Sequence, residues 1–330
     1  DFGLWKDRIN GIVEAYWRKS KDCVTSEYVP VTTGFFNQSY NTSVLQNNGV
    51  EFSLSVAVLK SKDYNLSVSA NVAWNQNKLK KYNSPNTSLA LDKYVGYPMG
   101  AVFSGKYEGI DPETGMYKFK LRPDAVTNKD GYLREPNNYY YYLGTSVAPF
   151  TGGFNLNFSY KNIGLSVGGS YSVKAKMVDN IESPAGYELL SGSKLESIPT
   201  PHNDLYRNHL NVKREVRNRW TPENRTGVKY PRLIDAYGKK LGLDLTNPTL
   251  TTITRGALLE DISYLRINTI ALSYSLPQRV LERINFSSAA LNLTLNNFFT
   301  ITKYSGIDPE VPGATYPVSR SVTIGLNVGF

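Results

Sequence analysis

The sequence predicts an all-β fold: the wall of a transmembrane antiparallel β-barrel. Three observations support this prediction. Where the chain shows a periodic pattern, apolar and polar residues alternate with a period of two, and helical periodicity is nearly absent. The alternating segments number about eight, and their length of roughly 10 residues suits tilted strands that cross a bilayer. Long and short connections follow one another without exception, which is typical of bacterial barrels.

The strands and their connections can be placed in chain order. The expected strands cover residues 8–19, 48–60, 64–75, 149–160, 163–174, 261–277, 285–298 and 319–330. Short turns are expected at Lys60–Asp63 and Lys161–Asn162, and a short amphipathic helix at Gln278–Ile284. The long connections, at about 20–47, 76–148, 175–260 and 299–318, are expected on the extracellular side.

The two faces of the predicted wall differ in chemistry. One face is apolar and suits lipid, whereas the other carries Ser, Asn, Thr and Gly and suits a wet lumen better than a packed sandwich core. Asparagines expected to face the lumen, where they either bind a polar solute or hydrate the wall, are Asn71, Asn75, Asn155, Asn157, Asn292 and Asn296. Aromatic residues expected near strand ends as a membrane girdle, with core packing as the alternative, are Trp17, Trp74, Tyr160, Tyr274 and Phe330.

Composition excludes several classes of protein. With 41% apolar and 12% aromatic residues the chain is too hydrophobic for intrinsic disorder, and it has no apolar stretch of the ~18 residues that a membrane helix needs. One cysteine, Cys23, and two histidines supply neither a disulfide nor a metal centre, so neither a metal nor a cofactor is expected. The chain begins without a targeting signal and ends in an alternating run, which suggests a piece of a longer protein that includes its C-terminus.

No catalytic constellation is apparent, and the chain is not expected to be an enzyme. Asp308 with Glu310, and Asp111 with Glu113, are possible calcium ligands, but Asp-Pro-Glu is favoured as a turn sequence. The net charge is +9, from 37 Lys and Arg against 28 Asp and Glu. A basic stretch is formed by Lys213, Arg214, Arg217, Arg219 and Arg225. This basic stretch is more typical of a solvated loop, or of a loop that binds lipopolysaccharide or the carboxylates of a partner, than of a nucleic-acid site.

Several segments resemble the SusC/RagA family of TonB-dependent outer-membrane transporters. The most extensive is Asn297–Val311, followed by Tyr316–Arg320 and the final strand to Phe330. Shorter similar segments, in the same order as in the family, are Phe2–Arg8, Tyr16–Lys19, Asn48–Glu51, Arg219–Asn224 and Tyr264–Ile267. The resemblance implies that residues 1–330 are the C-terminal strands, about eight, of a 22-stranded barrel whose plug lies outside this chain.

The resemblance also implies a function and partners. The implied function is import of oligosaccharides or oligopeptides across the outer membrane of a Bacteroidota-type bacterium. TonB would supply the energy, and a SusD-like surface lipoprotein would act as a lid. Outer-membrane lipid and the remainder of the barrel are the other expected partners. A structural barrel subunit without transport is the alternative. The last strand resembles a barrel-assembly signal, so deletion of Val328–Phe330 is expected to block insertion.

Aromatic residues in the two longest connections are the candidates for ligand or lid contact. They are Tyr139, Tyr140, Tyr141, Tyr142 and Trp220. Aromatic faces stack on sugars and bury peptide side chains at low entropic cost. Packing of the loops against one another is the alternative explanation.

Overall fold

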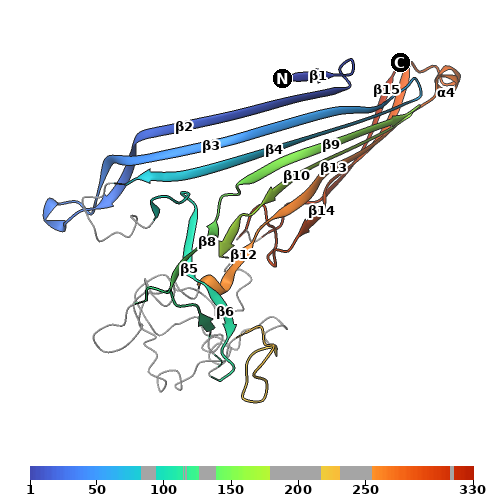
Figure 1. The fold of residues 1–330 in the computed structure, drawn as a ribbon. Coiled ribbons are helices and arrows are strands. Elements are labelled where there is room, and N and C mark those ends of the chain that lie inside the picture. The colour runs from blue at the N-terminus through green and yellow to red at the C-terminus, as the bar shows by residue number, and fades with distance from the viewer. Residues whose placement is uncertain are drawn as a thin grey trace.

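One large antiparallel sheet dominates the computed structural model, which describes residues 1–82, 94–113, 115, 117–125, 139–178, 217–230, 255–312 and 316–330. Its strand order is β1-β2-β3-β4-β9-β10-β13-β14-β15 (Figure 1). The strands are β1 (Phe2–Leu4), β2 (Ile9–Tyr28), β3 (Asn37–Lys60), β4 (Tyr64–Lys81), β9 (Phe150–Tyr160), β10 (Ile163–Val173), β13 (Tyr264–Ser275), β14 (Ser288–Thr302) and β15 (Ser321–Gly329). The predicted all-β wall is therefore confirmed, with the three-residue β1 as an addition.

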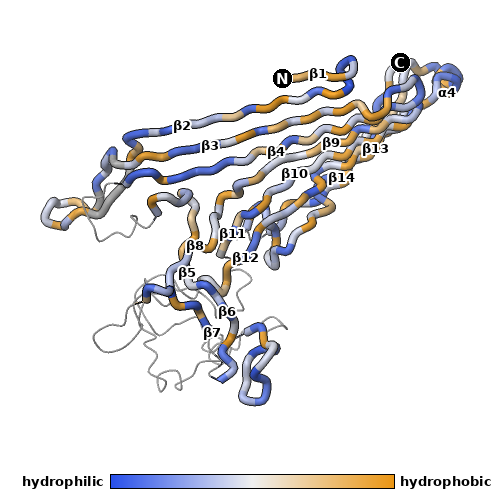
Figure 2. Tube along the Cα trace, viewed as in Figure 1, coloured by the Kyte–Doolittle hydropathy of each residue, from blue (hydrophilic) through white to orange (hydrophobic). Residues whose placement is uncertain are grey.

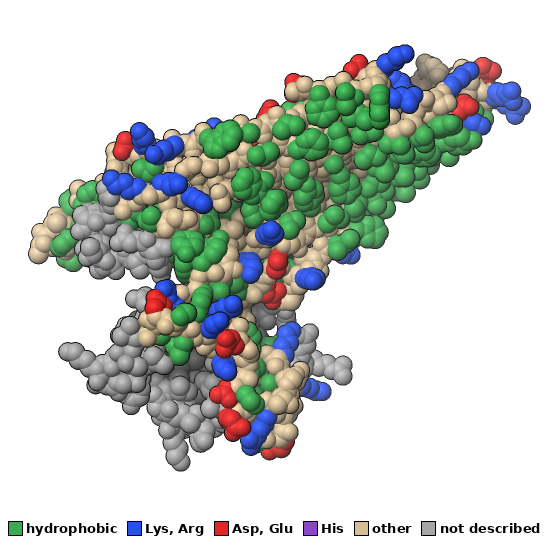
Figure 3. Space-filling view, viewed as in Figure 1, with side chains coloured by type: hydrophobic (Ala, Val, Ile, Leu, Met, Phe, Trp, Pro, Cys, Tyr) green, Lys and Arg blue, Asp and Glu red, His purple; other side chains and the backbone are tan. Residues whose placement is uncertain are grey.

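The cross-strand register gathers the apolar residues on one face. One row across the sheet contains Val56, Val68, Leu156, Val167, Ile270, Leu295 and Val322. The next row of residues, on the opposite face, contains Ser55, Ser69, Asn155, Gly168, Thr269, Asn296 and Ser321. Figure 2 shows the alternation along each strand, and Figure 3 shows the resulting continuous apolar surface. The period of two thus separates a lipid-compatible face from a hydrated one.

Aromatic rings of one strand cover glycines of the next. Four directly paired positions show this arrangement: Phe2 with Gly11, Tyr16 with Gly49, Tyr171 with Gly152, and Phe154 with Gly169. At each of these glycines an added Cβ would overlap the partner ring. The missing side chain makes room for the ring, which shields the backbone that glycine leaves open.

The connections at one end of the sheet match the sequence prediction. β3 ends at Lys60 and β4 begins at Tyr64, while Lys161 and Asn162 alone link β9 to β10. The helix α4 (Gln278–Arg283) lies where the amphipathic turn was expected, and Pro277 precedes it. This end of the sheet also carries both chain ends (Figure 1).

The first long connection is shorter than predicted. β2 and β3 continue as a paired ladder to Tyr28 and Asn37, so residues 29–36, with η1 (Val31–Thr33), form the link in place of 20–47. β4 likewise continues beyond Asn75 to Lys81. The extensions carry polar residues on both faces, so alternation does not mark them, although backbone pairing continues.

The other long connections contain small structural units beyond the far end of the sheet. β5 (Ala101–Gly105) pairs with β8 (Tyr140–Thr145), β6 (Tyr107–Ile110) with β7 (Tyr117–Phe119), and β11 (Lys176–Val178) with β12 (Leu259–Asp261). The 3-10 helix η5 (Arg255–Leu258) leads into β12. A small core of Ala175, Ile262 and Tyr304 joins these loops to the sheet. Parts of the predicted connections 76–148 and 175–260 lie outside the described residues.

No helix in the described part of the chain is long and apolar enough to span a membrane.

Candidate functional site

The polar face of the sheet carries all six asparagines that were predicted to face a lumen. Some of their capacity for hydrogen bonds is used within the wall. Asn71 Oδ1 accepts a bond from the Gly153 N–H (2.7 Å), and Asn157 Oδ1 accepts one from Ser166 Oγ (2.8 Å). Asn296 accepts from Thr269 Oγ1 at 3.1 Å. Asn296 Nδ2 also donates to Ser321 Oγ at 3.0 Å, so these bonds brace neighbouring strands.

Three hollows among the described residues of this face could accommodate polar solutes, one of them about 310 Å³ in volume and lined by Glu14, Glu51 and Thr151. The largest of the three, about 580 Å³, is lined by Ser53, Ser69, Asn71 and Asn155 together with the β1 segment. The smallest, about 280 Å³, lies between Asn65, Asn157, Ser166, Ser273 and Asn292. Neutral hydroxyl and amide groups with both donor and acceptor capacity dominate the smallest hollow, which suits uncharged polar ligands.

The tyrosine run lies mainly on β8. The Tyr142 ring packs against Tyr97 (centroids 4.8 Å apart) and Phe103 (5.7 Å), and the Tyr141 hydroxyl donates to the Leu121 carbonyl at 2.9 Å. Loop-to-loop packing therefore engages these two side chains, while Tyr142 remains 40% exposed. Burial raises the pKa of Tyr139 and of Tyr142, so both hydroxyls stay protonated at neutral pH. Ligand or lid contact by the run stays a prediction.

Trp220 is enclosed by the loops. It is 5% exposed, and its indole Nε1 donates to the Pro112 carbonyl at 2.9 Å, which ties the two longest connections together. Its backbone N–H also bonds to the Tyr230 carbonyl. In this arrangement Trp220 supports the loops from the inside. Direct contact with a ligand would require the segments around Pro112 and Trp220 to separate.

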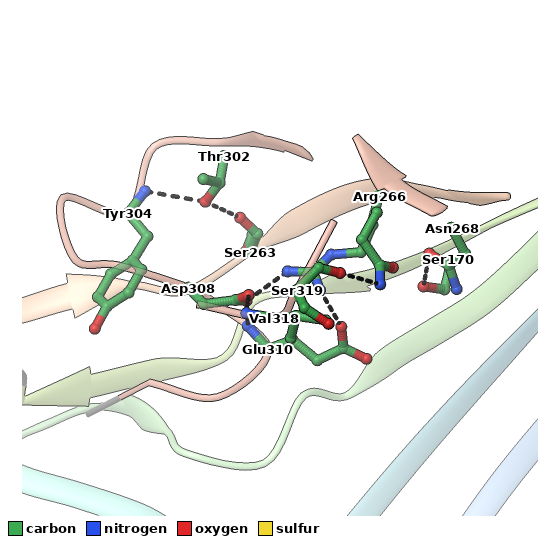
Figure 4. Close-up of polar contacts among 11 residues, drawn as sticks. Ser170, Ser263, Arg266, Asn268, Thr302, Tyr304, Asp308, Glu310, Val318 and Ser319 are labelled. Atoms are coloured by element: carbon green, nitrogen blue, oxygen red, sulfur yellow. Dashed lines mark hydrogen bonds and ion pairs between the residues drawn. The ribbon is translucent and has the colours of Figure 1, made fainter. Parts of the chain in front are cut away.

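A buried ion cluster that the sequence did not reveal joins β13 to the β14–β15 connection (Figure 4). The Arg266 guanidinium, 3% exposed, bonds to Asp308 and lies 2.9 Å from Glu310. Asp308 also accepts from the backbone N–H groups of Glu310 (3.0 Å) and Val318 (3.2 Å). Burial alone would raise the pKa of Asp308, but these hydrogen bonds and Arg266 outweigh it and hold that pKa below its ordinary value. The carboxylate therefore stays charged at neutral pH.

Both Asp-Pro-Glu sequences form the turns that were expected. Asp111 accepts from the Glu113 N–H (2.8 Å), as Asp308 does from Glu310. Among the described residues no group of three or more acidic, histidine or cysteine side chains is placed to hold a metal ion. Of the basic stretch, Arg217, Arg219 and Arg225 are described, whereas Lys213 and Arg214 lie outside the described residues.

The predicted girdle residues lie at both ends of the apolar face. Tyr160 and Tyr274 both pair with Ile163, in the same row as Tyr64, near the short turns. Trp17 and Trp74 lie near the opposite end, and Trp17 is 75% exposed. Phe330 stands edge-on to Phe286, 5.1 Å away, and is otherwise exposed. Their role at a membrane interface remains a prediction.

An apolar face, a hydrated face and loops folded over one end define part of the wall of an outer-membrane β-barrel. Searches with family models gave no match. The curated relatives include TonB-dependent receptor P26 of Formosa agariphila and TonB-dependent receptor SusC of Bacteroides thetaiotaomicron. Each is 25% identical to this chain across 100% of it, which corresponds to 34% and 31% of those relatives. The chain thus spans about a third of their length.

Solved structures give the same result. The structure of the RagAB peptide transporter matches 99% of this chain with a TM-score of 0.74 and 26% identity, over 34% of its own chain. The RagAB peptide importer in its "open-open" state matches with a TM-score of 0.72. The chain is SusC/RagA-like and has the fold of a TonB-dependent outer-membrane transporter barrel, which confirms the resemblance found in the sequence and the outer-membrane location. The names of these relatives denote receptors and transporters, in agreement with the absence of a catalytic constellation from the sequence.

Proposed function

We propose that this chain forms part of the wall and the extracellular loops of a TonB-dependent importer of oligosaccharides or oligopeptides. The observation that carries the proposal is the continuous polar face, lined with Asn, Ser and Thr and backed by an equally continuous apolar face. Such a wall separates lipid from a hydrated path and offers many weak hydrogen bonds, which let a polar solute bind and move on. The names of the matched proteins favour import over a purely structural role.

The loop surface around β8 is proposed as the contact for the ligand or for a SusD-like lipoprotein lid. Tyr142 is partly exposed above an aromatic support of Tyr97 and Phe103. A rigidly held ring loses little entropy when a sugar or a peptide side chain stacks on it. The support explains how a loop residue can be ordered before binding.

The experiment uses the full-length protein and compares a Tyr139→Ala/Tyr142→Ala variant with Tyr141→Phe. Affinities for oligosaccharide and oligopeptide mixtures, and recovery of a lipoprotein partner, are measured by calorimetry and co-purification. The double variant removes two rings and should lose roughly 30-fold in affinity for ligand or lid, since each ring contact contributes on the order of 1 kcal/mol. Tyr141→Phe keeps every ring and should bind normally. If the double variant is folded and binds both partners as the wild type does, the assignment is wrong.

A further inference from the structure

Lysines continue the outer face of the sheet beyond its last aromatic residues. Lys19 and Lys78 both pair with Gln46, so the three residues form one row across β2, β3 and β4. By alternation this row lies on the same face as Trp17 and Trp74. Lys80, two residues beyond Lys78, is exposed and lies in the bulge where the β3–β4 register shifts between Leu45 and Val44. Figure 3 shows the basic side chains that gather past the apolar surface, over the far ends of these strands.

The height of this row fits the headgroup layer of a membrane. Tyr64 and Trp74 mark the ends of the apolar face on β4 and are ten residues apart. At about 3.3 Å per residue and a tilt of about 40°, this separation corresponds to about 25 Å, the height of the apolar band of a membrane barrel. Lys78 lies four residues further along, or about 10 Å higher by the same arithmetic.

The charges in this row are unbalanced. Lys19 and Lys78 form no ion pair with any carboxylate in the described part of the chain, and neither does Lys80. Glu14 and Glu51 pair with each other three strand positions inside the row of Trp17, and by alternation they lie on the opposite, polar face. The nearest described acid along β2 is Asp22, in a bulge where the β2–β3 register shifts.

We propose that Lys19, Lys78 and Lys80 bind phosphate groups of the outer-leaflet lipid headgroups and so fix the depth and tilt of the barrel. Lipid is the occupant because the row lies on the same face as the lipid-facing apolar surface, one row beyond Trp17, Asn48 and Gln76. An ammonium on a flexible stem reaches a phosphate while its methylenes stay along the apolar surface. Each such charge near an anionic leaflet adds about 1 kcal/mol of attraction. The inference does not depend on what the protein transports.

The test measures lipid bound to the purified full-length protein by native mass spectrometry. The probes are bisphosphorylated lipid A and the same lipid without phosphates. The test variant is Lys19→Gln/Lys78→Gln. The control is Arg18→Gln/Lys62→Gln, which removes the same total charge, one from the polar face and one from a short turn. Lys19→Arg/Lys78→Arg keeps the charge. Heat-modifiable migration in gels verifies that every variant is folded.

We expect wild type, the Arg variant and the Arg18/Lys62 control to prefer the phosphorylated lipid, and the Lys→Gln variant to bind it about tenfold more weakly. Equal retention by the Lys→Gln variant would overturn the proposal, as would equal binding of the two lipids by the wild type. Loss of a co-purifying acidic protein with unchanged lipid binding would also overturn it, because the surface would then serve a protein partner.

Discussion

Arg266 anchors the β14–β15 connection to the wall through charge. Its guanidinium and the Asp308 carboxylate are both at least 95% shielded from solvent, and Glu310 completes the cluster. Breaking a buried pair leaves one charge without its partner, which is far more costly than losing an exposed pair. This cluster therefore determines how firmly the described parts of the β14–β15 connection, residues 303–312 and 316–320, are held over the end of β13.

Replacement of Arg266 by Gln should release this connection. We expect a loss of about 3–5 kcal/mol of local stability, because Asp308 would remain buried without its cation. Hydrogen exchange of amides in residues 303–320, measured in detergent, reports the change directly. Arg122→Gln is the control, since Arg122 pairs with Asp124 at an exposed position and should cost at most about 1 kcal/mol. Equal protection of the connection in the two variants would contradict this interpretation.

The sequence could reveal half of this cluster. Asp308 and Glu310 stand in an Asp-Pro-Glu turn, and the turn formed as local chemistry dictates. Arg266 is 42 residues away along the chain, on a strand whose polar face accepts many residue types. Nothing in a single sequence specifies which polar side chain meets which loop, because that depends on the packing of three segments.

At the scale of elements, alternation located the strands within the apolar band, and paired polar residues located the turns. Alternation did not predict the strand extensions in which both faces carry polar residues, which are β2 beyond Lys19 and β4 beyond Asn75. β1 was also missed, because three residues are too few to show a period. Register, in contrast, is fixed by the requirement that the main apolar rows lie on one face, since a slip by one position would invert the faces.

Glycines opposite aromatic rings offer a test of this packing. A Cβ at Gly169 would overlap both the Phe154 ring and the Arg266 carbonyl oxygen, whereas a Cβ at Gly325 would meet no atom nearer than 4.0 Å. Gly169→Ala should therefore cost about 1–3 kcal/mol through overpacking, and Gly325→Ala should be nearly neutral. The unfolding midpoints of the two variants in urea, in lipid vesicles, give the comparison. Equal midpoints would show that the strands shift freely to accommodate the methyl group.

At the scale of the whole molecule, the sheet has two open edges within the described residues. Most of β2 beyond its short pairing with β1, and the outer edge of β15, present backbone groups without partners in the sheet. In hydrocarbon each unpaired backbone N–H or C=O costs several kcal/mol, so spanning strands must belong to a closed barrel. Since this chain spans about a third of its relatives, the missing partners are expected to be other strands of a longer chain.

It follows that residues 1–330 expressed without further strands should not insert stably. In lipid, the nine residues of β15 would leave several backbone N–H and C=O groups unpaired, and β2 would leave more. The burial of one apolar face does not offset this penalty. We expect the isolated segment to be degraded by added protease and to migrate identically in gels with and without heating. The full-length protein should be protease-resistant and heat-modifiable. A protected, heat-modifiable barrel formed by this segment, as one copy or several, would show that its edges can close on themselves.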